Sequence, residues 1–161
     1  MTRTHTYLDR TGWAPGPWDG EPDHVEWRDP ATGLPCLTHR NRFGTWCGYV
    51  GVPPGHPWHG KDYDDEALYD VDVHGGLTYA DLCDPDAPPQ EGICHVPEPG
   101  EPEDVWWLGF DCGHFMDQAP GLEAREREMT DPMPPMLGLT YRTLGFVVDE
   151  TTGLAGQVAR A

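Results

Sequence analysis

The sequence predicts an α+β domain, with an antiparallel sheet made of a meander plus a hairpin, long Pro/Gly-rich loops and a C-terminal helix packed on the sheet. Three observations lead to this prediction. Short apolar runs between residues 24 and 111 are separated by turn residues. The apolar spacing becomes helical after residue 141. The 20 Gly and 18 Pro among 161 residues favour loops and short elements.

Residues 1–22 are expected to form an irregular N-terminal arm, because their Pro, Gly and Trp residues show no periodicity. We expect Trp13 and Trp18 of this arm to pack on residues 23–161, which we interpret as a single α+β domain.

The meander is predicted from three neighbouring runs. His24–Arg28 alternates in polarity, the sequence DPATG forms a turn, Leu34–His39 is extended, and Thr45–Val52 follows a second turn. Strands joined by such short turns pair antiparallel.

A hairpin is predicted at Gly75–Gly76, because this pair separates the alternating run Asp70–His74 from the run Leu77–Ala80. The polar, Pro-rich residues 81–104 are expected to form an irregular excursion. The apolar run Val105–Asp111 is typical of a strand buried on both faces.

The C-terminal helix is predicted from an apolar stripe with Thr140 as its N-cap. The stripe consists of Leu144, Val147, Val148, Thr151, Leu154, Ala155 and Val158. The alternative is a strand at Gly145–Asp149 followed by a shorter helix. In the loop-like stretch Ala119–Pro135, a short helix is expected over Glu123–Met129.

Charge and cysteine content limit the classes of partner and compartment. A net charge of −18, with Lys61 as the sole lysine, disfavours non-specific binding to nucleic acid or to an anionic membrane. Five cysteines without a CxxC pair favour reduced thiols. Residues 1–10 contain no apolar segment of the signal-peptide type, and no apolar run approaches about 18 residues. We therefore expect a cytoplasmic protein that does not enter a membrane.

The segment that follows the last predicted strand carries the most suggestive chemistry. Asp111, His114 and Asp117 are potential metal ligands or proton carriers at a strand end, and His74 lies at the predicted hairpin. His74, Asp111 and His114 are the catalytic candidates, and with Asp117 they are the candidates for holding a divalent metal that activates water. Cys112 beside His114 suggests a nucleophilic thiolate as an alternative. Hydrogen-bonded structural polar residues are the plainer interpretation.

A second group of candidates lies in the Pro-rich loop at residues 51–65. Imidazole, ammonium, phenol and indole groups there can bind, or stack on, an anionic small molecule. The candidate ligand-binding residues are Arg42, His56, Trp58, His59, Lys61, Tyr63, His74, Thr78 and Asp111. Anchoring of the loop is the alternative role for those within it.

No P-loop, Rossmann, zincin or nucleic-acid-binding pattern occurs in the sequence. The strings WCGYVGVPPGHPWHGKDYDD, VHGGLTYA and VWWLGFDCGH, with the helical C-terminus, resemble a family of small uncharacterised proteins of actinobacterial phages and their hosts. The resemblance extends from about Asp23 onward. The resemblance implies a phage accessory role, such as counter-defence in the host cytoplasm. It assigns a catalytic role to no residue of this chain.

Three functional hypotheses follow. The first is a phage-type accessory protein that sequesters a small anionic, nucleotide-like ligand in a pocket built by the 51–65 loop, the His74 hairpin and the Asp111–His114 strand end. The second is a metal-assisted hydrolase of a nucleotide or phosphoester. The third is an acidic inhibitor of a host protein that mimics DNA. The sequence leaves both catalysis and self-association undecided.

Overall fold

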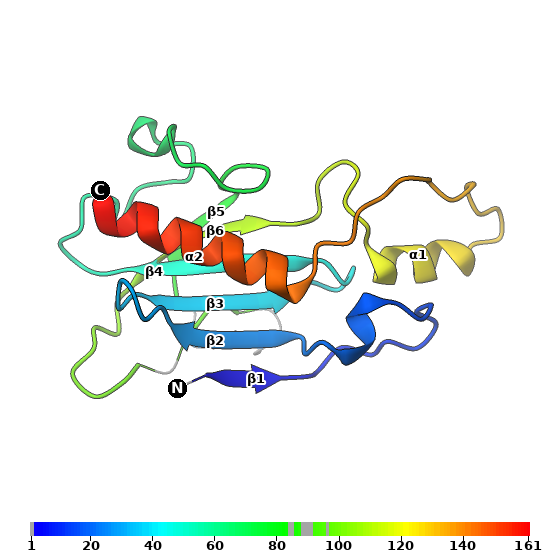
Figure 1. Ribbon diagram of the computed structural model, residues 1–161, viewed down its shortest axis with the longest axis horizontal. Helices are drawn as coiled ribbons and strands as arrows, with labels where there is room; N and C mark the ends of the chain where they lie inside the picture. The colour runs from blue at the N-terminus through cyan, green and yellow to red at the C-terminus, as the bar shows by residue number, and fades with distance from the viewer. Residues whose placement is uncertain (1, 84–85, 88–91, 96) are drawn as a thin grey trace.

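The structure, a computed structural model, covers residues 1–161 and describes all of them except residues 1, 84–85, 88–91 and 96. The described residues form one six-stranded antiparallel sheet in the order β1-β2-β3-β4-β6-β5 and two α-helices (Figure 1). The strands are β1 (Arg3–His5), β2 (His24–Arg28), β3 (Pro35–Arg40), β4 (Trp46–Val52), β5 (Tyr79–Leu82) and β6 (Trp106–Asp111). The helices are α1 (Pro120–Arg127) and α2 (Leu144–Arg160), and short 3-10 turns occupy Pro17–Gly20 and Glu66–Leu68. The α+β prediction is confirmed.

The meander is also confirmed. β2, β3 and β4 pair antiparallel in sequence order, and β4 is buried along its whole length. Close packing at β4 depends on Gly48, where a Cβ would collide with the ring of Phe110 and with Thr151. The predicted central strand is β6, which pairs with β4 on one side and with β5 on the other.

The hairpin prediction at Gly75–Gly76 is wrong in its pairing. The two glycines do form a turn, with φ of 70° and 80° and a hydrogen bond from Gly76 N to Val73 O. However, β5 pairs with β6, and residues 70–74 form no strand. Two amides of this segment bond instead to side chains of α2: Asp72 N donates to Gln157 and His74 N donates to Glu150.

The N-terminal arm is less irregular than expected. Its residues Arg3–His5 form the edge strand β1, which pairs with β2. Trp18 is buried and packs edge-on against Tyr141, with ring centroids 5.1 Å apart. The arm is thus part of the folded domain.

A buried charge network ties this arm to the rest of the molecule. Arg40 is fully buried, stacks over the ring of Trp46 and donates to a carboxylate oxygen of Glu21 at 2.9 Å. Glu21 also accepts from the Tyr141 hydroxyl and from Leu144 N, the first amide of α2. Asp23 pairs with Arg40 as well. The buried cation is therefore compensated by two carboxylates.

The single long C-terminal helix is confirmed, and the alternative of a strand at 145–149 is wrong. The helix begins later than expected: Thr143, and not Thr140, is the N-cap, and its hydroxyl accepts from Phe146 N at 3.1 Å. Thr140 instead bridges Asp117 in a short parallel contact. The short helix expected over Glu123–Met129 is present as α1, which begins three residues earlier.

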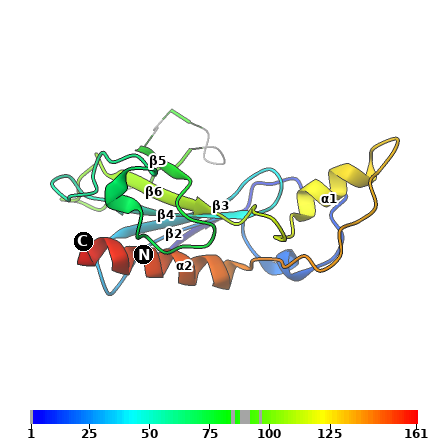
Figure 2. The same cartoon turned by 90° about the horizontal axis from the view of Figure 1, so that it is seen from above.

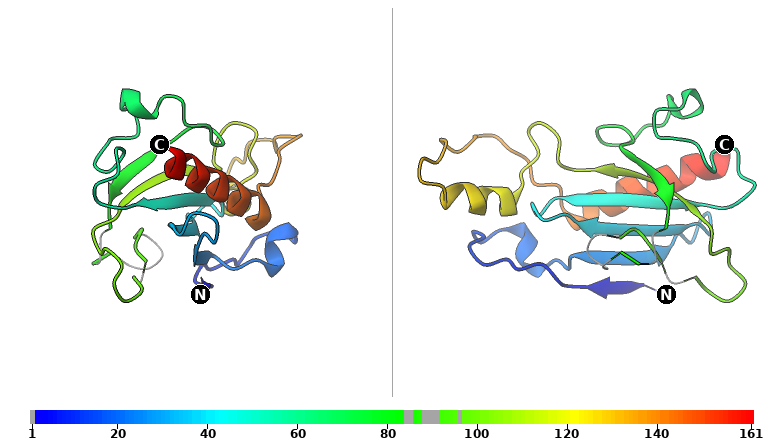
Figure 3. Two further views of the ribbon diagram at one scale, coloured as in Figure 1. Left: turned by 60° about the vertical axis from the view of Figure 1, so that its left-hand side comes forward. Right: turned by 180° about the vertical axis from the view of Figure 1, so that it is seen from behind.

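The sheet has two different faces. α2 lies along one face (Figure 2). Its buried stripe there meets side chains of β3, β4 and β6 and consists of Val147, Thr151, Leu154, Ala155 and Val158. The opposite face, seen from behind in Figure 3, carries a smaller apolar cluster that includes Leu37, Tyr49 and Trp107. Among the residues that the structure describes, no helix combines the length and apolar character needed to cross a membrane.

The expectation of uniformly reduced cysteines is wrong. Cys83 and Cys94 form a disulfide with a Cα–Cα distance of 4.9 Å. Spacing alone could not identify this pair, because five cysteines allow several pairings. Parts of that predicted excursion, residues 84–85, 88–91 and 96, lie outside the described residues. Cys36, Cys47 and Cys112 are free and buried.

Candidate functional site

A group of polar side chains meets at the end of β6. We call it the strand-end cluster, and it comprises His74, Thr78, Asp111, His114, Asp117 and Arg142. Five of these six residues were candidates from the sequence. They come from the Gly-Gly turn, the start of β5, the end of β6, the following loop and the segment before α2.

Asp117 is the centre of the cluster. Its side chain is 2% exposed. One carboxylate oxygen accepts from His74 Nε2 at 2.7 Å and from His114 N at 3.1 Å, and the other accepts from Arg142 Nε at 2.9 Å. Burial alone raises the pKa of Asp117, but the hydrogen bonds from His74 and Arg142 outweigh burial, so its pKa is lowered. Asp117 is therefore a fixed anion.

Asp111 holds the other half of the cluster. One of its oxygens accepts from the Thr78 hydroxyl at 3.1 Å, and the other accepts from Gly113 N at 2.9 Å. The second oxygen also lies 3.5 Å from His114 Nε2. The rings of His114 and His74 are 5.6 Å apart between centroids, which connects the two halves.

Local backbone conformation brings these groups together. A Cβ at Gly75 would collide with the imidazole of His114, so the glycine is needed for this approach as well as for its positive φ. Met116 adopts the left-handed conformation, with φ of 72°. Hydrogen bonds from Thr140 N to Met116 O and from Gln118 N to Thr140 O hold this turn, which aims Asp117 inward.

α2 fixes the remaining members. The ring of His74 packs edge-on against Phe146 at 5.3 Å between centroids, and the Arg142 guanidinium lies 4.7 Å from the centroid of the same ring. His74 is thus fixed by its backbone bond to Glu150, by its ring contact and by Asp117.

The hydrogen bonds determine what the cluster can do chemically. All four carboxylate oxygens of Asp111 and Asp117 have partners within the protein. Among the described residues, none forms a hydrogen bond with the terminal guanidinium nitrogens of Arg142, and the Arg142 side chain is 30% exposed. Asp111 and Asp117 therefore hold neighbouring hydrogen-bond donors in place, in the way that carboxylates orient metal-binding imidazoles in other proteins.

The 51–65 loop does not join this cluster. β6 runs antiparallel to β4, with Trp106 opposite Val52 and Asp111 opposite Cys47. The loop leaves β4 at the end where β6 begins, about 17 Å from Asp111 at about 3.3 Å per residue. Figure 1 shows the loop beside the C-terminus of α2. The structure thus separates two parts of the pocket that we expected to be one.

Most polar groups of the loop anchor it. His56 Nε2 bonds to Val158 O at 2.7 Å, His59 Nε2 bonds to Asp104 O at 2.9 Å, and Lys61 lies 3.5 Å from Asp65. Trp58 packs on the core beneath α2, and Tyr63 is exposed. These contacts agree with the loop-anchoring alternative.

Two further candidates, Arg42 and Cys112, can be placed. Arg42 lies in the turn between β3 and β4 with its guanidinium 4.8 Å from the centroid of the Phe43 ring. Cys112 is buried, and burial together with nearby carboxylates raises its pKa, which opposes a reactive thiolate. Within the described part of the chain, no three His, Cys, Asp or Glu side chains are arranged to hold a metal ion. Of the four metal candidates, His74 and the amide of His114 bond to Asp117, and His114 Nε2 lies 3.5 Å from Asp111.

Sequence reasoning missed Arg142. Arg142 belongs to no motif. The one feature that could have drawn attention to it is a positive charge just before the helical stripe, in a chain with only ten Lys and Arg residues.

It also missed a buried polar row on the sheet face opposite α2. The row contains His24, His39, Cys47 and Tyr49. His39 Nε2 bonds to the Tyr49 hydroxyl at 3.1 Å. The alternation of β2 could have indicated it, because His24 and Glu26 share the face opposite Val25 and Trp27.

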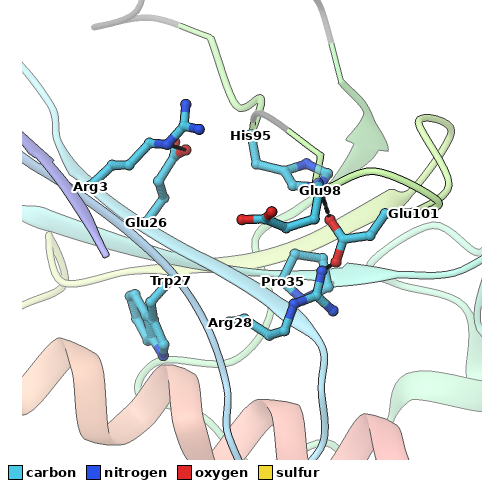
Figure 4. A pocket seen from close by; sticks show the side chains of 8 residues that line it. All are labelled: Arg3, Glu26, Trp27, Arg28, Pro35, His95, Glu98 and Glu101. Atoms are coloured by element: carbon cyan, nitrogen blue, oxygen red, sulfur yellow. Dashed lines mark hydrogen bonds and ion pairs between the residues drawn. The ribbon is translucent and has the colours of Figure 1, made fainter. Parts of the chain in front are cut away.

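A small cavity lies on the same side of the sheet, near the start of β3 (Figure 4). Its volume is about 40 Å³, which is enough for a few water molecules. Arg3 and Glu26 face each other across β1 and β2, and Arg28 pairs with Glu101 (Figure 4). These pairs fill the space, so the cavity is too small for a nucleotide.

No protein-family model, curated protein or solved structure matches this chain. The resemblance to the phage family stays a prediction, and the function is inferred from the geometry above.

Proposed function

We propose that the protein binds a small phosphate-bearing, nucleotide-like ligand at the strand-end cluster. The observation that supports this proposal is the arrangement of donors and acceptors. Asp111 and Asp117 are saturated from within, whereas Arg142 directs free guanidinium nitrogens toward solvent. A guanidinium with two free N–H groups suits a phosphate oxygen pair.

The chain also offers an exposed aromatic side chain next to a member of the cluster in the sequence. Phe115 follows His114 directly and is 85% exposed. A base that stacks on such a ring gains about 1–3 kcal/mol. In this proposal Phe115 takes the stacking role that the sequence suggested for Trp58 or Tyr63, while Arg142 contacts the phosphate.

The net charge of −18 does not forbid this binding. Charges beyond about 8–10 Å are largely screened at physiological ionic strength, so nearby donors decide affinity for a small anion. The charge instead selects against long polyanions, which would meet many carboxylates at once. A ligand the size of a mononucleotide can reach the nearby donors without meeting many carboxylates.

The test is a thermal-shift series with inorganic phosphate, adenosine, AMP and cyclic AMP as probes. A ligand that binds only the native state raises the melting temperature. We expect AMP or cyclic AMP to raise it and adenosine to raise it less. The Arg142→Gln variant should lose the shift, whereas Arg160→Gln, which removes an exposed guanidinium at the other end of α2, should keep it.

Equal shifts in both variants would show that the ligand binds elsewhere. No shift with any phosphate-bearing probe in the unmodified protein would overturn the proposal.

A further inference from the structure

A long exposed segment projects from one end of the molecule. Residues 125–138, which we call the methionine arm, are exposed at every position and extend from the end of α1 toward α2. Figures 1 and 2 show α1 and this arm beyond the end of the sheet. Because the arm covers little of the core, burial in the monomer does not explain its apolar residues.

The apolar side chains of the arm are large. Met129 is 61% exposed, Met133 is 79%, Met136 is 57% and Leu137 is 87%. Four such side chains within nine residues are unusual on a monomer surface and are typical of an interaction site. Methionine is flexible and polarisable, and it is used on surfaces that adapt to apolar partners.

The charges around these side chains are acidic. Glu126 and Glu128 precede Met129, Asp131 follows it, and all three acids are exposed. The two arginines of the arm are directed to the body of the protein, because Arg127 donates to Gly12 O at 2.7 Å and Arg125 lies 5.7 Å from the centroid of the Phe43 ring. The outer surface of the arm therefore combines methionines with uncompensated carboxylates.

We propose that the methionine arm is a docking surface for a basic amphipathic segment of another protein. The methionines would cover the apolar side of that segment, and Glu126, Glu128 and Asp131 would pair with its lysines or arginines. The net charge of −18 steers such a segment toward the protein. The same charge opposes a second copy of this chain and an anionic lipid surface as occupants.

The test uses two synthetic 18-residue helical peptides with the same leucine pattern, one with lysine and one with glutamate at the polar positions. Binding is measured by isothermal titration calorimetry at 0.15 M salt. We expect the lysine peptide to bind and the glutamate peptide not to bind. In a sample with labelled methionine methyl groups, the NMR signals of Met129, Met133 and Met136 should shift on addition of the lysine peptide.

The arm variant is Met129→Ser/Met133→Ser/Met136→Ser, whose substitutions are all at exposed positions. This variant should bind the lysine peptide at least tenfold more weakly than the unmodified protein does. The matched control, Tyr69→Ser/Leu82→Ser, removes exposed apolar side chains outside the arm and should bind as the unmodified protein does.

Three outcomes overturn the proposal. One is the absence of binding, and another is equal binding by the arm and control variants, which would reveal only non-specific attraction to an acidic protein. The third is an unmodified protein that dimerises while the arm variant is monomeric, because a second copy would then be the occupant. None of these outcomes depends on the strand-end cluster, so this proposal and the proposed ligand site fail separately.

Discussion

His39 is buried on the sheet face opposite α2, where burial and the neighbouring His24 lower its pKa from 6.5 to about 4. Between these values the unfolded chain binds a proton that the folded protein does not, so stability falls as the pH falls. The full difference between the two pKa values corresponds to about 3 kcal/mol in the free energy of unfolding. We expect the free energy of unfolding, measured with urea, to be near its full value above pH 6.5 and to decrease steadily toward pH 4.

The His39→Gln variant removes this titration while keeping a polar side chain. Its stability should be lower at pH 7, because the bond to Tyr49 is altered, but it should change less between pH 6.5 and pH 4. Parallel pH profiles for the two proteins would show that another group controls the acid sensitivity.

Asp117→Asn tests the centre of the strand-end cluster. The amide keeps the shape of the carboxylate but removes the charge that His74 and Arg142 share. Loss of charge-assisted hydrogen bonds at a buried acceptor costs about 2 kcal/mol. The urea midpoint should fall accordingly, at an unchanged m-value.

Asp149→Asn, at an exposed position of α2, is the control and should change stability by less than about 0.5 kcal/mol. A neutral effect of Asp117→Asn would contradict the network described above.

At the scale of single residues, the sequence indicated which side chains would meet where those residues lie close together along the chain. Asp111, His114 and Asp117 follow a strand within seven positions, and His74 adjoins two glycines. Arg142 was not predicted, because only the left-handed turn at Met116 and its bonds to Thr140 bring that part of the chain to Asp117. Such a long-range contact leaves no local pattern.

The start of α2 allows a prediction at the scale of an element. The Thr143 hydroxyl accepts from Phe146 N, so Thr143→Ala should lower the free energy of unfolding by about 1 kcal/mol. Thr140→Ala should change it by less than about 0.5 kcal/mol, because the contacts of Thr140 are made by its backbone. Thermal unfolding followed by circular dichroism distinguishes the two, and a larger loss at Thr140 would place the cap where the sequence suggested it.

The elements also show where sequence patterns are reliable. The strands β2, β3, β4 and β6 were predicted because each alternates or is continuously apolar between turn residues. The partner of β5 was not, since periodicity identifies a strand without identifying its neighbour. Residues 70–74 alternate like a strand, but two of their amides, at positions 72 and 74, donate to Gln157 and Glu150 of α2.

The disulfide gives a prediction for the whole molecule. Cys83 and Cys94 are 11 residues apart, and closing a loop of this size stabilises a protein by about 2–3 kcal/mol in the chain-entropy model. Reduction, or the Cys83→Ser/Cys94→Ser variant, should therefore lower the melting temperature. Thiol titration of the unreduced, denatured protein should find three thiols, and five would contradict the bond.

The contacts of Glu21 have a consequence for how the native protein opens. One carboxylate serves the arm, the buried Arg40 of β3 and the first amide of α2. These segments cannot separate without leaving a buried charge unpaired, which is costly. Amide hydrogen exchange should accordingly show residues 17–23, the end of β3 and the first turn of α2 opening as one cooperative unit, with a single free energy, while the methionine arm exchanges independently and fast.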